Sequence, residues 1–262
     1  MSTITDMSSL VAAEEAAAGL NETWYKGSIP SAANQYSSLW TTNGNPGAGA
    51  AQGTNDGATC DKTTVGAFTR LANAGAGVNH ILLMEALGAN VGAVMLYDRL
   101  WHSSAHSGTV LGPTAFTQPA LTRYTNGYGV ECWLDVYTAI GATSRTATIS
   151  FTHPVNGVGQ AATLATVASQ PAGQCVRFTG AGTDAITSVQ SVGLSATTGT
   201  AGNYGLTLRK LLAMVPLAGS MGGRLDALRN ALRKVEADAC LELLVMPNTT
   251  STGQLGGSLV IG

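Results

Sequence analysis

Residues 128–138 read YGVECWLDVYT, in which apolar side chains alternate with acidic and aromatic ones. Every second position from Val130 to Val136 is apolar, which is the period of a strand with one buried face. The stretch follows Asn126-Gly127, a dipeptide typical of tight hairpin turns. The pattern predicts a half-buried strand, and its second face carries Glu131, Trp133, Asp135 and Tyr137.

Similar stretches recur on both sides of this strand. Residues 145–152 alternate in the same way, and the apolar run 79–101 is broken by Gly88 and Gly92. We interpret that run as two buried strands or one bent strand with glycine bulges, with a buried helix as the competing interpretation. Short strands separated by turns predict an antiparallel β-sandwich, jelly-roll-like, over residues 79–262. Further strands are expected at 161–168, 174–179, 186–196, 203–215, 240–246 and 255–261.

Residues 1–78 have a different character and predict a separate N-terminal region. Residues 6–19 are expected to form a short helix ending at Gly19. The run from Thr41 to Asp61 is rich in Gly, Ala, Asn and Thr and has few side chains that can build a core. A flexible linker is one interpretation, and an extended arm lying on another subunit is the one we favour. Isolated aromatic residues would anchor the arm: Trp24, Tyr25, Tyr36 and Trp40.

One helix is expected within the β region, at residues 223–235. Leu225, Leu228, Leu232 and Val235 recur at helical spacing and would pack on a sheet. The same segment carries a small basic patch, for which a solvated face or salt bridges to a neighbour is the favoured interpretation over nucleic-acid binding. The patch consists of Arg224, Arg229, Arg233 and Lys234, and Arg209 and Lys210 would extend it.

The chain carries very little charge. Of 262 residues, 13 are Lys or Arg and 15 are Asp or Glu, which gives a net charge of -2. This balance argues against a polyanion-binding protein, and no stretch has the ~18 unbroken apolar residues of a membrane span. Since a monomer normally covers itself with charged side chains, we expect much of the surface to be covered by other subunits. A monomeric β-protein with a threonine-rich surface is the alternative.

The cysteines are expected to be free. Residues 1–20 lack the basic start of a secretory signal, so synthesis in a reducing cytosol is expected. None of the cysteines lies in a CxxC pair, and zinc binding is therefore unsupported. If the product leaves the cytosol, disulfides become feasible, but the sequence does not choose among the pairings of Cys60, Cys132, Cys175 and Cys240.

Several short motifs are candidates for sites of chemistry. His102 and His106 have zinc-ligand spacing for a helix, but they lie in a predicted loop exit. The glycine-rich segments 157–162 and 180–185 are interpreted as hairpin turns, and Ser220 lacks the glycine pattern of a hydrolase nucleophile. The sequence therefore predicts no catalytic residue, cofactor or metal.

The acidic and aromatic strand face is the remaining candidate. Glu131 and Asp135 could act as paired carboxylates on a glycoside. The flanking Trp133 and Tyr137 suit a sugar or a neighbouring subunit equally well. We expect a sugar-binding or subunit-contact surface here.

The chain resembles structural proteins of tailed-bacteriophage virions over residues 80–262. The similarity rests on residue patterns of strands and turns, in the blocks Leu121–Gly127, Ser144–Thr148, Ser188–Val192 and Thr198–Gly202. It implies a non-enzymatic capsid decoration (cement) protein, made in the host cytoplasm and located on the capsid surface. A homotrimer that contacts the major capsid protein is the implied assembly. A carbohydrate-binding module on the tail or receptor side is the alternative. The resemblance supplies no catalytic residue.

Overall fold

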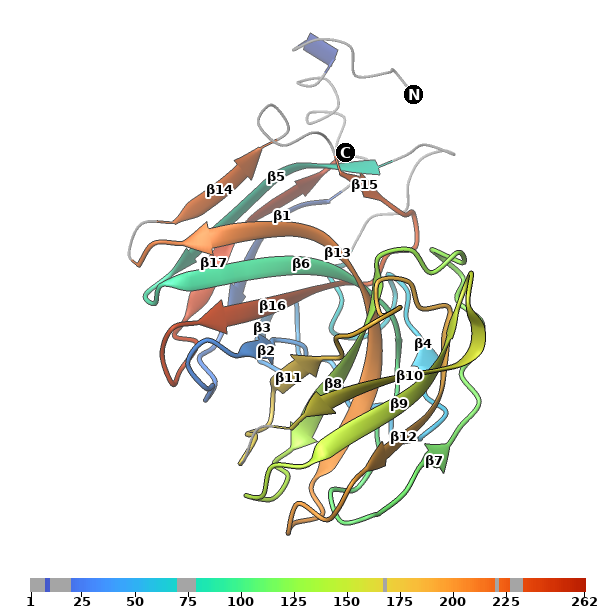
Figure 1. Ribbon diagram of the computed structural model, residues 1–262. Coiled ribbons are helices and arrows are strands. Elements are labelled where there is room, and N and C mark those ends of the chain that lie inside the picture. Colours follow the sequence, from blue (N-terminus) through green and yellow to red (C-terminus); the bar gives the residue numbers. More distant parts are fainter. Residues whose placement is uncertain (1–7, 10–19, 70–78, 167–168, 220–221, 227–232) are drawn as a thin grey trace.

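A computed structural model of the chain describes residues 8–9, 20–69, 79–166, 169–219, 222–226 and 233–262 (Figure 1). The described chain is mainly β, and its named strands pair antiparallel throughout. The predicted mainly β, antiparallel class is thus confirmed. The strands form three sheets.

Six strands of the central sheet form a closed barrel. Its strands follow one another around the ring in the order β13, β8, β11, β2, β16 and β6, and β13 also pairs with β6. The short β4 (Ala58–Thr59) pairs with the end of β6. The strands of the ring are β13 (Asn203–Leu217), β8 (Val130–Thr138), β11 (Gln174–Arg177), β2 (Tyr36–Ser38), β16 (Leu241–Pro247) and β6 (Gly92–His102).

Irregularities in β13 allow the ring to close. The register between β13 and β6 shifts between Leu208 and Arg209 and again between Leu211 and Ala213. Such bulges bend a strand and increase its twist, which a small barrel requires. As a result β13 and β6 are long, bent strands that run past both outer sheets (Figure 1).

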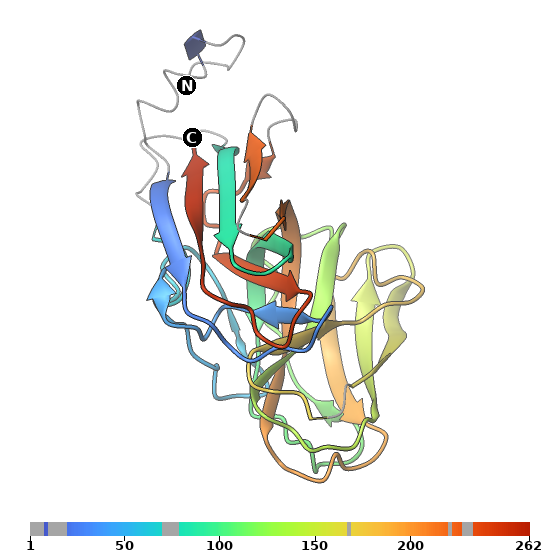
Figure 2. The same ribbon diagram turned by 90° about the vertical axis from the view of Figure 1, so that its left-hand side faces the viewer.

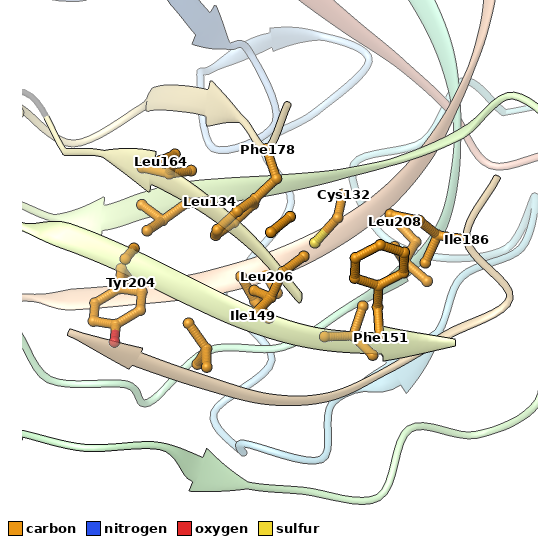
Figure 3. Close-up of a cluster of buried hydrophobic side chains, with 14 of the residues drawn as sticks. Cys132, Leu134, Ile149, Phe151, Leu164, Phe178, Ile186, Tyr204, Leu206 and Leu208 are labelled. Carbon is orange, nitrogen blue, oxygen red and sulfur yellow. The ribbon is translucent and has the colours of Figure 1, made fainter. Parts of the chain in front are cut away.

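One outer sheet packs on the β8 side of the barrel and has the order β10, β9, β12 and β7. Inward-facing side chains of β9 and β12 meet the outer face of β8 and β13, which carries Leu134 and Leu206 (Figure 3). The resulting core also takes in Trp101 and Phe116. The strands of this sheet are β10 (Gly157–Ala165), β9 (Thr146–His153), β12 (Ser188–Leu194) and β7 (Thr114–Ala115).

The other outer sheet packs on the opposite part of the barrel wall and has the order β14, β5, β17, β1 and β3, with β15 also on β5. Figure 2 shows β1, β17 and β5 side by side, in blue, red and green. Trp24, Ile81 and Leu259 from this sheet pack against Val94 and Leu243 of the barrel. Its strands are β14 (Gly223–Asp226), β5 (Asn79–Gly88), β17 (Leu255–Ile261), β1 (Leu20–Lys26), β3 (Gly44–Asn45) and β15 (Lys234–Val235).

Every strand predicted between residues 128 and 261 is present, with ends shifted by a few residues. The run 79–101 forms two strands, as the first interpretation predicts. They belong to different sheets, because the chain turns between Gly88 and Gly92 and passes from the outer sheet into the barrel.

The predicted boundary at residue 79 does not separate two units in the described chain. Strand β1 pairs with β17 along its whole length, and β2 fills the place between β11 and β16 in the barrel. Residues 20–69 therefore fold onto their own body, and the prediction of a separate arm over 1–78 is wrong for them. Of the helix predicted at 6–19, only Ser8 and Ser9 are described, and both are helical.

The helix predicted at 223–235 is wrong at both of its described ends. Residues 223–226 form β14 and residues 234–235 form β15, and both pair with β5. Leu225 packs at the edge of the outer-sheet core from its position in β14. The middle of that segment, 227–232, lies outside the described residues.

Candidate functional site

The predicted acidic and aromatic face of β8 lies inside the barrel. Trp133 and Asp135 are buried, while Glu131 and Tyr137 are partly buried. The prediction of an exposed sugar-binding or subunit-contact surface is therefore wrong for Trp133 and Asp135. The reason is ring closure, which turns this face inward while Leu134 and Val136 face the outer sheet.

Asp135 is one of four charged side chains that meet inside the barrel. Arg209 donates two hydrogen bonds to the Asp135 carboxylate, with Nη1 2.8 Å and Nη2 2.6 Å from its oxygens. Glu242 accepts from Arg209 Nε and, at 2.7 Å, from Arg99 Nη1. Arg99 Nη2 completes the ring at 3.4 Å from Asp135. The four side chains come from β6, β8, β13 and β16, so the network joins four of the six barrel strands.

Aromatic and hydroxyl groups surround the network. The Arg99 guanidinium lies 4.5 Å from the centre of the Trp40 ring, and that of Arg209 lies 5.6 Å from Trp133. Tyr137 Oη accepts from Arg99 at 2.8 Å, and Thr207 Oγ1 donates to Asp135 at 2.7 Å. These contacts replace the water that the ions lose on burial.

His102 lies at one end of this network. Its Nδ1 is 2.9 Å from Arg99 Nη2. Since a guanidinium only donates hydrogen bonds, Nδ1 accepts and the ring proton is on Nε2. This Nε2–H lies on the side of the ring away from Arg99.

The network has two positive and two negative members, so the barrel interior is balanced in charge. Burial raises the pKa of the Asp135 carboxyl, but the Arg209 and Arg99 guanidinium groups outweigh this and hold its pKa below the usual range. An ionised carboxylate in contact with two arginines holds no proton that it could give to a substrate. The arrangement therefore acts as a polar clamp that fixes the register of the barrel strands.

Glu131 marks the open end of the same face. It forms a salt bridge of 2.7 Å with Arg177, whose side chain is 45% exposed. The indole nitrogen of Trp133 and the hydroxyl of Tyr97 donate to the Glu131 carboxylate at 3.1 and 3.3 Å. The Glu131 carboxylate at the rim of the barrel is thus bound by neighbouring side chains of the same chain.

A second buried ion pair joins the N-terminal segment to the barrel. Arg123 donates to the Asp98 carboxylate at 2.7 and 3.0 Å and to the carbonyl of Cys60 at 2.9 Å. Asp98 also accepts from the backbone N–H of Cys240 at 2.9 Å. Burial raises the pKa of Asp98 to about 6, although Arg123 acts in the opposite direction.

The four predicted arm anchors have different environments. Trp24 and Trp40 are buried in the chain's own cores, and Trp40 Nε1 donates to the carbonyl of Ala50 at 3.1 Å. Tyr36 is partly buried in β2 and meets Trp133 edge-on, with ring centroids 5.0 Å apart. Tyr25 is 62% exposed. Of the four, Tyr25 presents the largest free surface.

The two histidines with zinc-ligand spacing have separate partners. His102 ends β6 and faces Arg99 and Trp40, whereas His106 stacks on Tyr204 with ring centroids 5.4 Å apart. Burial lowers the pKa of His106 to about 4. No cluster of three or more metal-ligating side chains was found in the part of the chain that the structure describes.

The other motifs fall in turns or on the surface. Gly157 begins β10 directly after the hairpin turn from β9, as the turn interpretation predicts, and Gly180 and Gly182 also lie in a turn. Ser220 lies outside the described residues. Arg224 is exposed and pairs with Glu85 at 3.3 Å.

Sequence reasoning missed Arg99 and Glu242 as members of a site, and its placement of Arg209 in a surface basic patch is wrong because Arg209 is buried in the barrel. Their one signal was position, because each is a charge within an apolar strand such as the run MLYDRLW at 95–101. Comparison with protein-family models, curated proteins and solved structures found no match to the chain. Within the described residues, no helix has the length and hydrophobicity to cross a bilayer.

Proposed function

We propose that this chain is a non-enzymatic structural protein of a tailed-bacteriophage virion that decorates and stabilises the capsid. The supporting observation is the small number of charged side chains that remain on its surface. The sequence has 28 charged residues, and among those that the structure describes seven are buried. They are Lys26, Asp98, Arg99, Arg123, Asp135, Arg209 and Glu242. A surface with so few charges suits repeated contacts with other subunits.

Exposed apolar side chains support the same proposal. In the described part of the chain, large hydrophobic residues that are at least 39% exposed occur in pairs that are close in sequence at four places. Each pair would bury apolar area against a neighbour at about 25 cal/mol per Å². The pairs are Leu87 with Val91, Val110 with Leu111, Val155 with Val158, and Leu211 with Met214.

The proposed assembly is a homotrimer bound to the major capsid protein on the capsid surface, after synthesis in the host cytoplasm. Many weak contacts repeated on a lattice would give avidity. The jelly-roll-like arrangement and the contacts with neighbouring subunits belong to this proposal, whereas an arm formed by residues 20–69 does not. Within the N-terminal segment, the exposed ring of Tyr25 is the group we assign to such a contact. Light scattering of the purified chain should give the mass of three copies.

Sedimentation with particles tests the proposal. Capsids of the encoding phage, assembled without this chain, are mixed with the purified protein and pelleted. We expect saturable binding, and replacement of one or more of the four apolar pairs by threonine should weaken it at least tenfold. Val65→Thr is the matched control, since Val65 is 74% exposed but belongs to none of these pairs. Sedimentation no greater than that of an unrelated β-protein would refute the proposal.

A further inference from the structure

The segments that contain Cys60 and Cys240 pair with neighbouring residues along one edge of β6. The backbone N–H of Cys60, just after β4, donates to the carbonyl of Leu100 at 2.9 Å. The carbonyl of Cys240, just before β16, accepts from the N–H of Arg99 at 2.8 Å. Because Arg99 and Leu100 are adjacent, the end of one strand meets the beginning of the next.

Their side chains occupy the same buried cluster. Both thiols are free and at most 1% exposed, and they pack with Trp40, Ala67 and the ring of Tyr137. Each thiol affects the pKa of the other: Cys240 lowers that of Cys60, and Cys60 raises that of Cys240. We propose that Cys60 and Cys240 form a disulfide when the protein meets an oxidising environment. This inference goes beyond the proposed function and does not depend on it.

The other two cysteines are placed where they cannot join the pair. Cys132 points from β8 into the core below the outer sheet, as Figure 3 shows. Cys175 points into the barrel and packs with Trp133 and Leu244. They lie on opposite faces of the barrel wall, and each belongs to a side-chain cluster that contains neither Cys60 nor Cys240. The structure thus selects a single bridge among the pairings that the sequence left open.

The surroundings of Cys60 favour its reaction. Burial raises the pKa of this thiol, but contacts with Cys240 and His102 and the charge of Arg99 lower it well below the ordinary value. A thiolate is the form that attacks a disulfide. The neighbouring residues Thr59 and Asp61 are exposed, and β4 is only two residues long. A small local opening is therefore enough to admit an oxidant.

The oxidant we assign is a low-molecular-weight disulfide. The Cys60 thiolate attacks one of its sulfurs, forms a mixed disulfide and releases one small thiolate. The Cys240 thiol then loses its proton and attacks the Cys60 sulfur, which releases the second small thiol. In sum, two protein thiols lose two electrons and two protons, and the small disulfide is reduced to two thiols.

Peptide mapping of the full chain tests this bridge. After incubation with oxidised glutathione, the protein is denatured, its free thiols are alkylated, and it is digested and analysed by mass spectrometry. We expect a cross-linked peptide pair containing Cys60 and Cys240, with Cys132 and Cys175 alkylated. Four alkylated cysteines, a persistent glutathione adduct or a different pair would each overturn the proposal.

Thermal unfolding provides a second readout. Oxidation should raise the midpoint of the wild-type protein by about 5–10 °C, because a bridge between distant residues restricts the unfolded chain. The rise should be absent in Cys60→Ala and Cys240→Ala and retained in the matched control Cys132→Ala. If a variant does not fold, the wild-type peptide map still decides. An equal rise in all variants would contradict the assignment.

Discussion

At the level of single residues, one glycine of the segment 41–61 lies directly against a tryptophan ring. Trp40 is buried, and a Cβ placed on Gly49 would overlap its ring. Gly66, at φ +103°, lies against Gly49 and the same ring. Gly49 is therefore small because the backbone passes directly over an aromatic side chain at this position.

Gly49→Ala should destabilise the protein, because the added methyl group must displace the Trp40 ring. Overpacking of this kind typically costs about 1–3 kcal/mol, and urea denaturation would measure it. The matched control is Gly47→Ala, since a Cβ at Gly47 has no atom within 4 Å. Equal stability of the two variants would show that the segment does not pack on Trp40.

Asp135→Asn should be strongly destabilising. The change removes one of two carboxylates that balance Arg99 and Arg209, and loss of one partner from a buried ion pair costs about 3–5 kcal/mol. Glu131→Gln is the control on the same strand face, and we expect at most about 1 kcal/mol because its partner Arg177 is exposed. Comparable losses, measured by urea denaturation, would contradict the buried network.

Because of His106, the free energy of unfolding should depend on pH under acidic conditions. Burial lowers its pKa in the folded protein to about 4, from 6.5 in a free side chain. The unfolded chain therefore binds more protons between these values, and the free energy of unfolding falls as pH drops from 6.5 towards 4. Relative to His106→Phe, which keeps the stacking on Tyr204, the wild type should lose up to ~3 kcal/mol. A constant difference across this range would refute the assignment.

At the level of elements, the short strand β2 determines whether the barrel is closed. Its three residues occupy the place between β11 and β16, and β1 covers the free edge of β17. The N-terminal segment thus contributes to closure of the barrel, although its sequence has few of the apolar runs typical of a protein core. Its contribution comes from backbone pairing and from the tryptophans that follow β2 and lie in β1.

A chain lacking residues 1–78 should fail to form the native barrel. Removal of β1 and β2 exposes the edges of β17, β11 and β16 and the core around Val94 and Leu243, so we expect aggregation and no cooperative thermal transition by circular dichroism. A chain that begins at residue 20 keeps all named strands and is the control. Cooperative unfolding of the shorter chain would show that the N-terminal segment is dispensable.

Local sequence patterns predict the positions of the strands, but they do not predict that the strands close into a barrel. The alternation in 128–138 and the turns at Asn126-Gly127 and in the segment 157–162 are short-range features, and the structure has the expected strands beside them. The inward face of β8 resembles a surface because its partners, such as Arg209, come from distant strands. The leucine spacing at 225–235 matches a helix, yet pairing with β5 prevails at the described ends.

At the level of the whole molecule, two long strands link all parts of the body. Strands β6 and β13 contribute side chains to the cores under both outer sheets, and each places an arginine of the network in the barrel. A load applied to either outer sheet would therefore pass through the barrel to the other. This is a property that a capsid-stabilising protein would need, and it accords with the proposed role.

Immunogold labelling of virions viewed in negative stain tests that role most directly. Antibodies against the purified chain are applied to intact particles of the encoding phage. The proposal predicts gold particles spread over the whole capsid surface at many positions per virion. Label confined to the tail, or absent from virions that tail antibodies still mark, would contradict it.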